Sequence, residues 1–125
     1  IKDDTKALKN IHTILQKNGT LLLLVPAKKK AYTNVDKQLG HYRRYEKKEL
    51  IDRLEKAHFK VDTIYFFNII GLISWYINGK INKRQSSLKS SQVRLFDRIV
   101  PVLSFIERYI KFPLGISLIV IARKI

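Results

Sequence analysis

The stretch Thr20-Leu21-Leu22-Leu23-Leu24-Val25-Pro26 decides the fold class of this chain. Its apolar run shows no polar alternation, which is typical of a strand buried on both faces, as in a parallel sheet. Pro26 closes the run because proline cannot donate a ladder hydrogen bond. Asn18 and Gly19 precede it, and both tolerate the left-handed backbone with which helices often end. A helix followed by a buried strand is typical of the alternating order of elements in an α/β fold.

The same spacing rules predict elements on both sides of this strand. Asp3 or Asp4 is expected to cap the first helix, because a carboxylate accepts the free N–H groups of the first turn. Pro101 is expected to break or kink the last helix, since proline lacks the backbone donor. We expect, in order, a helix over 4–17, a loop over 28–45, a helix over 46–58, a strand over 60–67, a helix over 69–83, a serine-rich connector over 85–91, a helix over 91–111 and a strand over 114–122.

The composition describes one small, strongly basic domain of 125 residues. With 25 Lys and Arg against 10 Asp and Glu, the net charge is +15, which favours anionic partners such as phosphates, acidic lipid surfaces or nucleic acid. The lack of cysteine excludes disulfides, zinc–thiolate sites and cysteine nucleophiles, and it fits a reducing, cytoplasmic setting. The start, Ile1-Lys2-Asp3-Asp4, has neither Met nor an apolar leader, which is typical of a piece of a longer protein.

Several short motifs follow one another along nearly the whole chain. They are Val25-Pro26-Ala27, Asp36, Gly40-His41-Tyr42-Arg43-Arg44-Tyr45, Glu49-Leu50, Phe59, Asn68, Gly71, Trp75, Phe96-Asp97-Arg98, Val100-Pro101 and Pro113-Leu114-Gly115-Ile116-Ser117-Leu118. In this order they resemble the class I S-adenosylmethionine-dependent methyltransferases. Within that family they are similar to a bacterial and archaeal subfamily that is type 11/12-like.

The resemblance implies an α/β fold, namely the carboxyl-terminal half of a Rossmann-like seven-stranded sheet. Residues 1–125 would form a partial methyltransferase domain that supplies strands five, six and seven. The last two strands would be antiparallel, and residues 69–112 would form a helical insertion between them. The amino-terminal, cofactor-binding half would be absent, so the partner would be that missing half or a second copy bound through an exposed sheet edge.

The family binds its cofactor with a glycine-rich turn after strand one and holds the ribose with an acidic residue after strand two. In this chain the glycines are scattered at 19, 40, 71, 79 and 115 and form no such cluster. The complete enzyme is therefore expected to use S-adenosylmethionine, whereas this chain alone is expected to bind none and to be inactive.

The resemblance also implies that the loop after strand five borders the site of the methyl acceptor. His41 or Asp36 is the candidate for removing a proton from the acceptor. The candidates for binding an anionic or amphiphilic acceptor are Tyr32, Tyr42, Arg43, Arg44, Tyr45 and Trp75. In the alternative interpretation, Asp36 pairs with one of the arginines and the tyrosines pack the loop onto the sheet. No metal site is expected, because no His or carboxylate pair shows ligand spacing with supporting partners.

Two binding functions are alternatives to the enzyme. The apolar stretch 64–77, with Trp75 and Tyr76, is flanked by lysines and would suit peripheral contact with an acidic membrane surface. It is too short and too interrupted to span a bilayer, which requires about 20 apolar residues. Nucleic-acid binding fits the charge, but no RRM, KH or zinc-finger signature supports it.

Overall fold

The computed structural model describes residues 1–73, 75, 90–110 and 113–125, and the chain divides into two units. The first unit contains residues 1–65 and 117–125, and the second contains residues 66–116. Most of the helix expected over 69–83, including Tyr76, lies outside the described residues, as does nearly all of the connector expected over 85–91.

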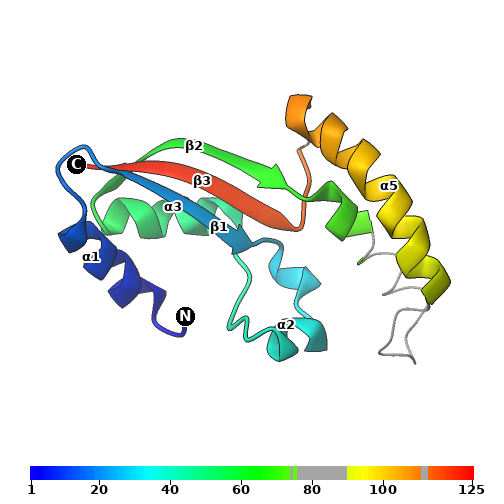
Figure 1. The fold of residues 1–125 in the computed structure, drawn as a ribbon. Coiled ribbons are helices and arrows are strands. Elements are labelled where there is room, and N and C mark those ends of the chain that lie inside the picture. Colours follow the sequence, from blue (N-terminus) through cyan, green and yellow to red (C-terminus); the bar gives the residue numbers. More distant parts are fainter. Residues whose placement is uncertain (74, 76–89, 111–112) are drawn as a thin grey trace. The chain divides into compact units, whose positions relative to one another are not determined.

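Three strands form one sheet in the order β1-β3-β2 (Figure 1). The strands are β1 (Thr20–Pro26), β2 (Phe59–Phe67) and β3 (Ser117–Lys124). β3 is antiparallel to β1, with Leu21 opposite Ala122, and Figure 1 shows it running opposite to β2 as well. The predicted strands are thus neighbours in a mixed α/β structure, and the last two are antiparallel as expected.

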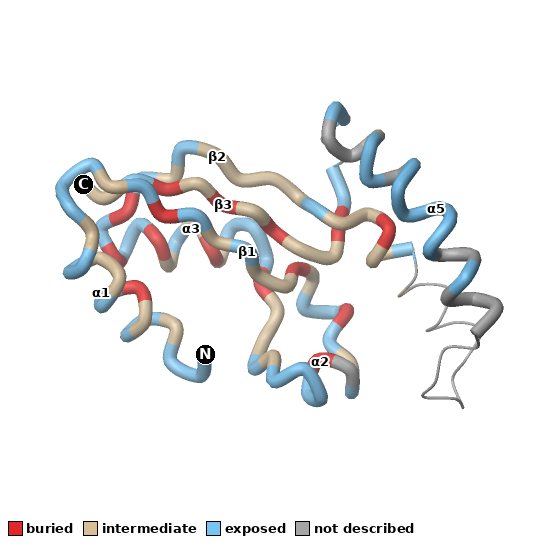
Figure 2. Tube along the Cα trace, viewed as in Figure 1, coloured by how far each residue is buried: buried red, intermediate tan, exposed pale blue. Residues whose placement is uncertain are grey.

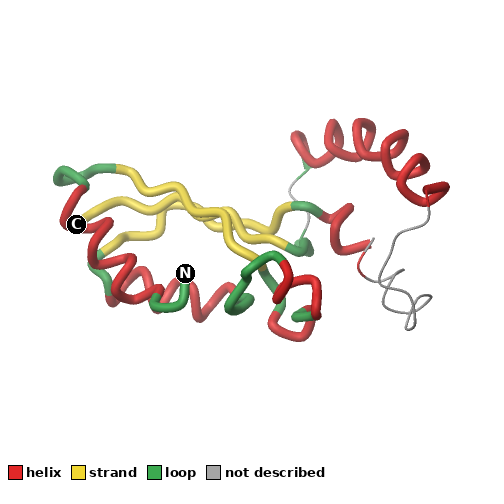
Figure 3. Tube along the Cα trace, turned by 60° about the horizontal axis from the view of Figure 1, so that its bottom comes forward, coloured by secondary structure: helices red, strands yellow, loops and turns green. Residues whose placement is uncertain are grey.

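Two helices cover one face of the sheet. α1 (Asp4–Ile14) and α3 (Lys47–Lys56) lie on the same side of it in Figures 1 and 3. Figure 2 shows buried positions along α1, α3 and β3. The side chains that form the core are Leu8, Leu50, Leu54, Phe59, Leu118, Val120 and Ala122. Because Leu118, Val120 and Ala122 alternate along β3, they all face the helices.

The opposite face of β1 corrects one prediction. Leu22 and Leu24 are 67% and 64% exposed, so β1 is not buried on both faces. They lie in register with Ile121 and Ile119, which continue the apolar row onto β3. The physical reason is that α1 and α3 cover only the face on which Leu21 and Leu23 lie.

The ends of the first helix agree only in part with the prediction. Asp3 caps α1 as expected, because its Oδ1 accepts the Lys6 N–H at 2.9 Å. The helix ends at Ile14 rather than Lys17, and Asn18 adopts a positive φ of 63° before β1.

The segment expected as a loop over 28–45 contains two short helices. They are a 3₁₀ turn, Lys29–Ala31, and α2, Asn34–Gln38. Glu46 precedes α3 without capping it through its side chain; its Oε1 accepts the Lys29 N–H at 3.0 Å instead. The 28–45 segment is therefore ordered by its own turns and tied to the start of α3.

The described parts of the second unit are largely helical. Residues 69–73 form helix, and α5 spans Ser90–Tyr109. Pro101 lies inside α5, so it does not break the helix, and the expected kink stays a prediction. Among the described residues, no helix is long and apolar enough to cross a membrane.

Candidate functional site

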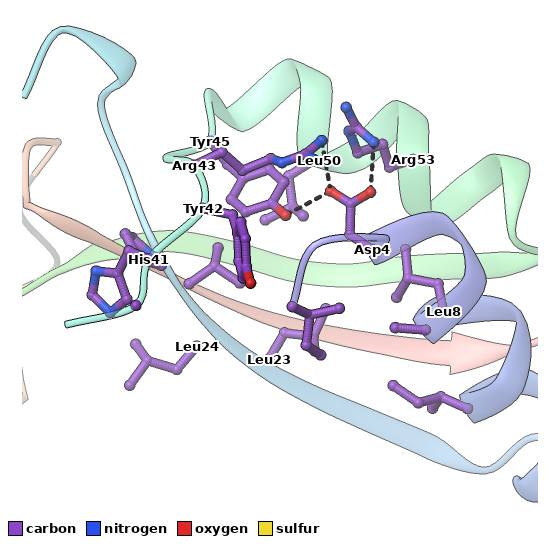
Figure 4. Close-up of a pocket in the computed structure, with 16 residues that line it drawn as sticks. Asp4, Leu8, Leu23, Leu24, His41, Tyr42, Arg43, Tyr45, Leu50 and Arg53 are labelled. Carbon is purple, nitrogen blue, oxygen red and sulfur yellow. Dashed lines mark hydrogen bonds and ion pairs between the residues drawn. The ribbon is translucent and has the colours of Figure 1, made fainter. Parts of the chain in front are cut away.

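An open cavity of about 310 Å³ lies in the first unit beside the second half of β1 (Figure 4). Its apolar wall comes from β1, α1 and the start of α3, and includes Leu8, Leu23, Leu24 and Leu50. Its polar wall comes mainly from the loop before α3 and consists of Asp4, His41, Tyr42, Arg43, Tyr45 and Arg53. The cavity therefore joins a hydrophobic surface to a mostly cationic rim.

The Asp4 cluster consists of Asp4, Arg43, Tyr45 and Arg53. The Asp4 carboxylate accepts hydrogen bonds from Tyr45 Oη at 2.6 Å and from Arg53 Nη1 at 2.9 Å, and Arg43 Nη1 lies 3.5 Å away (Figure 4). Arg53 also donates to Glu49 Oε1 at 3.1 Å. Asp4 is the only carboxylate among the lining residues, and these contacts engage both of its oxygens.

The electrostatics of the Asp4 cluster favour this pairing. Burial raises the pKa of Asp4, but the Tyr45 hydrogen bond and the cations of Arg53 and Arg43 together hold it below its ordinary value. Burial, followed by the hydrogen bond to Asp4, raises the pKa of Tyr45 to about 12. Tyr45 therefore remains a neutral donor at physiological pH, and the cluster holds the start of α1 to α3.

The Asp36 cluster consists of Thr33, Asp36, His41 and Arg44. Asp36 is 1% exposed, and its Oδ2 accepts the Thr33 N–H at 2.8 Å. Its Oδ1 lies 2.9 Å from Arg44 Nε and 3.2 Å from His41 Nδ1. Burial raises the pKa of Asp36, but the hydrogen bonds from Thr33, Arg44 and His41 outweigh this and lower it. Asp36 is thus a buried, ionised acceptor.

Asp36 fixes the orientation of His41. The His41 side chain is 38% exposed and lines the cavity, while its Nδ1 faces Asp36. The His41 N–H donates to the Asp36 carbonyl at 2.8 Å, and the His41 carbonyl accepts from Tyr32 Oη at 2.9 Å. A proton on Nδ1, shared with the carboxylate, leaves the lone pair on Nε2. Within the described part of the chain, Nε2 has no hydrogen-bond partner.

The structure brings some of the predicted site residues together. His41, Tyr42, Arg43 and Tyr45 line the cavity. Tyr42 and Arg43 keep exposed surface there, whereas Tyr45 is buried against Asp4. Tyr32 donates to the His41 carbonyl and does not line the cavity.

Asp36 and Arg44 have surroundings that differ from the roles expected for them, and the predicted role of Trp75 stays a prediction. Asp36 is buried and fully engaged, so it is positioned to orient His41 and not to remove a proton. Arg44 is almost buried, paired with Asp36 and bonded through Nη1 to the Ala27 carbonyl at 3.1 Å, so it braces the loop instead of facing an acceptor. Trp75 is half-buried and belongs to the second unit, so no role at this cavity is assigned to it.

Sequence reasoning missed Asp4 and Arg53 as lining residues. They lie 49 positions apart, and no local motif joins them. It also missed α2, although a local signal was present in Thr33-Asn34-Val35-Asp36. The Asp36 carboxylate accepts a hydrogen bond from the Thr33 N–H, as the acidic residue of a capping box does.

Within the described residues, no group of three or more His, Asp or Glu side chains is placed to hold a metal ion. No family model matches the chain, and no curated protein matches it.

Proposed function

We propose that this chain forms the acceptor side of an S-adenosylmethionine-dependent methyltransferase and that His41 removes a proton from the methyl acceptor. One observation carries the proposal: the buried Asp36 carboxylate holds His41 Nδ1, while the imidazole lines a mainly apolar cavity. An acceptor hydroxyl or amine must lose a proton as it gains a methyl group, and a positioned imidazole at neutral pH can take it.

The proton moves from the acceptor to His41 Nε2. Asp36 is the positioning residue, because it selects the Nδ1–H tautomer and stabilises the imidazolium that forms. Thr33 and Arg44 hold the carboxylate from two other directions, so its position does not depend on His41. The loop is thereby preorganised for proton transfer.

The cavity favours an amphiphilic acceptor that carries an anionic group. Its leucines supply the hydrophobic wall. Arg43 donates through Nη2 to the Lys2 carbonyl, but its side chain is 39% exposed at the rim and can offer its remaining N–H groups to a phosphate or carboxylate. Tyr42 adds a hydroxyl nearby. A long apolar acceptor would bury its chain against Leu8 and Leu23 and leave its anionic end at Arg43.

The cavity residues do not fit S-adenosylmethionine itself. Asp4, the only lining carboxylate, is engaged by Tyr45 and Arg53 and offers no free oxygen to ribose hydroxyls. Gly40, the only lining glycine, has no atom within 4 Å of its Cβ position and forms no close cradle. The proposal therefore places the methyl donor on residues outside this chain. The exposed row on β1 supports this, because so apolar a strand is typical of a larger sheet covered on both faces.

The test uses the longest product of the reading frame that contains this chain, with labelled S-adenosylmethionine and lipid extracts as acceptors. His41→Gln should lower kcat by about 100-fold or more while the Kd for S-adenosylmethionine stays unchanged. Lys30→Gln, an exposed change in the same loop, is the matched control and should have no effect. A longer product that transfers methyl groups at the wild-type rate after His41→Gln would overturn the proposal.

A further inference from the structure

α5 carries an exposed row that mixes cations with large apolar side chains. Arg94, Arg98, Val102, Phe105 and Tyr109 follow one another at spacings of four, four, three and four residues, so they lie along one side of the helix. All five are exposed; the last three are 61%, 64% and 70% exposed. The Phe105 and Tyr109 rings contact each other at 5.2 Å, as expected for neighbours on one helix face.

This arrangement leaves a large apolar surface facing solvent on a long helix. α5 has 20 residues, so it extends over about 30 Å. Ile99, next to the row, is 39% exposed as well. Exposed apolar patches of this kind mark binding surfaces in soluble domains. The helix is nevertheless not apolar enough to cross a bilayer.

We infer that α5 lies flat on an anionic lipid surface, with Val102, Phe105 and Tyr109 inserted at the level of the headgroups and Arg94 and Arg98 on lipid phosphates. Aromatic side chains with a polar tip favour the membrane interface, because the ring is apolar and the hydroxyl remains hydrated. Arginine can extend its charged end to the headgroups while its stem lies along the apolar surface.

Charge selects the lipid class. The chain has a net charge of +15, which attracts an acidic membrane and repels a second copy of the chain. Within the described residues, neither Arg94 nor Arg98 forms a salt bridge, so both guanidinium groups are available to phosphates. Nucleic acid would satisfy the arginines but would leave Val102 and the aliphatic surface in water.

This surface does not depend on methyl transfer. The proposed base and its cavity belong to the first unit, whereas α5 belongs to the second. Either proposal can therefore fail without the other, because His41 variants test the first and α5 variants test the second.

The experiment is co-sedimentation of the full chain with vesicles of phosphatidylcholine alone or of phosphatidylcholine mixed with phosphatidylglycerol. Wild type should bind the mixed vesicles and be released by salt, with far weaker binding to neutral vesicles. The triple variant Val102→Ser, Phe105→Ser, Tyr109→Ser should bind the mixed vesicles about tenfold more weakly than wild type, or not at all, because it loses the inserted groups. The double variant Arg94→Gln, Arg98→Gln should bind the mixed vesicles roughly tenfold more weakly than wild type.

The matched control is the sheet variant Leu22→Ser, which removes an exposed apolar side chain from the first unit, outside the cavity. It should bind the mixed vesicles like wild type. Binding to heparin, a polyanion without an apolar phase, should be unchanged in the triple α5 variant. The proposal is overturned if the wild type ignores mixed vesicles or binds both compositions equally. It is also overturned if the sheet variant loses binding instead of the α5 variant, or if the α5 variant loses heparin binding to the same extent.

Discussion

Asp4 and Asp36 are the centres of two similar clusters that leave different atoms available. Each carboxylate accepts from an arginine and from an uncharged donor, and each has a lowered pKa. Around Asp4, the Tyr45 hydroxyl and the Arg53 guanidinium both serve to join elements. Around Asp36, His41 gives one ring nitrogen to the carboxylate and keeps the other free of partners in the described residues.

The two clusters also differ in sequence range. The partners of Asp36 all lie between Thr33 and Arg44, so this cluster orders one loop. The partners of Asp4 lie 41 and 49 residues away, so that cluster ties α1 to α3. The proposed role of His41 rests on this difference, because only the Asp36 cluster keeps a ring nitrogen without a partner in the described residues.

The largest expected effect comes from deleting the more deeply buried carboxylate. Asp36→Ala should lower the free energy of unfolding by about 3–5 kcal/mol, because it leaves the almost buried Arg44 cation without its partner. Asp4→Ala should cost about 2–3 kcal/mol, since Arg43 and Arg53 can reach water but the buried Tyr45 hydroxyl loses its acceptor. Urea denaturation measures both. An Asp4→Ala loss equal to that of Asp36→Ala would show that burial does not separate the clusters.

Acid should weaken both clusters. A carboxylate whose folded pKa is depressed contributes stability above the unfolded value of about 3.9, and loses it as the pH falls through the folded value. The unfolding free energy should therefore decrease as the pH is lowered below about 4. Asp36→Asn combined with Asp4→Asn should flatten this decrease. A double variant with the wild-type pH slope would assign the acid sensitivity to other groups.

A smaller effect is expected from the tyrosine of the Asp4 cluster. Tyr45→Phe removes the 2.6 Å bond to Asp4 and should cost about 1.5–2 kcal/mol, since the acceptor is charged but keeps its bond from Arg53. Exposed Tyr42→Phe is the matched control and should change stability by less than about 0.5 kcal/mol. In an alkaline absorbance titration of the folded chain, one tyrosine should ionise near pH 12 and be missing from the Tyr45→Phe curve.

The smallest expected effect is that of Arg43→Gln. Arg43 lies 3.5 Å from Asp4, and its Nη2 donates to the Lys2 carbonyl at 2.9 Å, but both contacts are exposed, so its removal should cost about 1 kcal/mol or less. Arg53→Gln should cost more, because Arg53 bonds both Asp4 and Glu49 at close range. Thermal unfolding of the two variants compares them directly. Equal losses of stability would show that Arg43 supports the fold as much as Arg53 does and is not an open rim residue.

The sequence by itself determined the local elements. Helical spacing located α1 and α3, and the continuous apolar runs located β1 and β3, because these patterns depend on neighbours a few residues apart. It also contained a signal for α2, since the capping-box spacing of Thr33 and Asp36 is local. The loop was selected as a candidate site from the family resemblance, and the chemistry of its residues only suggested which role each could take.

Only the tertiary structure decided which of these residues act together. An apolar run shows that a strand can be buried, but the exposure of Leu22 and Leu24 depends on which helices lie above it. Whether Asp36 is a base or a buried acceptor depends on Arg44 and His41 reaching it through the folded loop. The pairing of Asp4 with Arg53 joins positions 49 residues apart, and no local preference encodes such a contact. These choices require the whole chain to fold, because burial and long-range contacts exist only after the elements have packed.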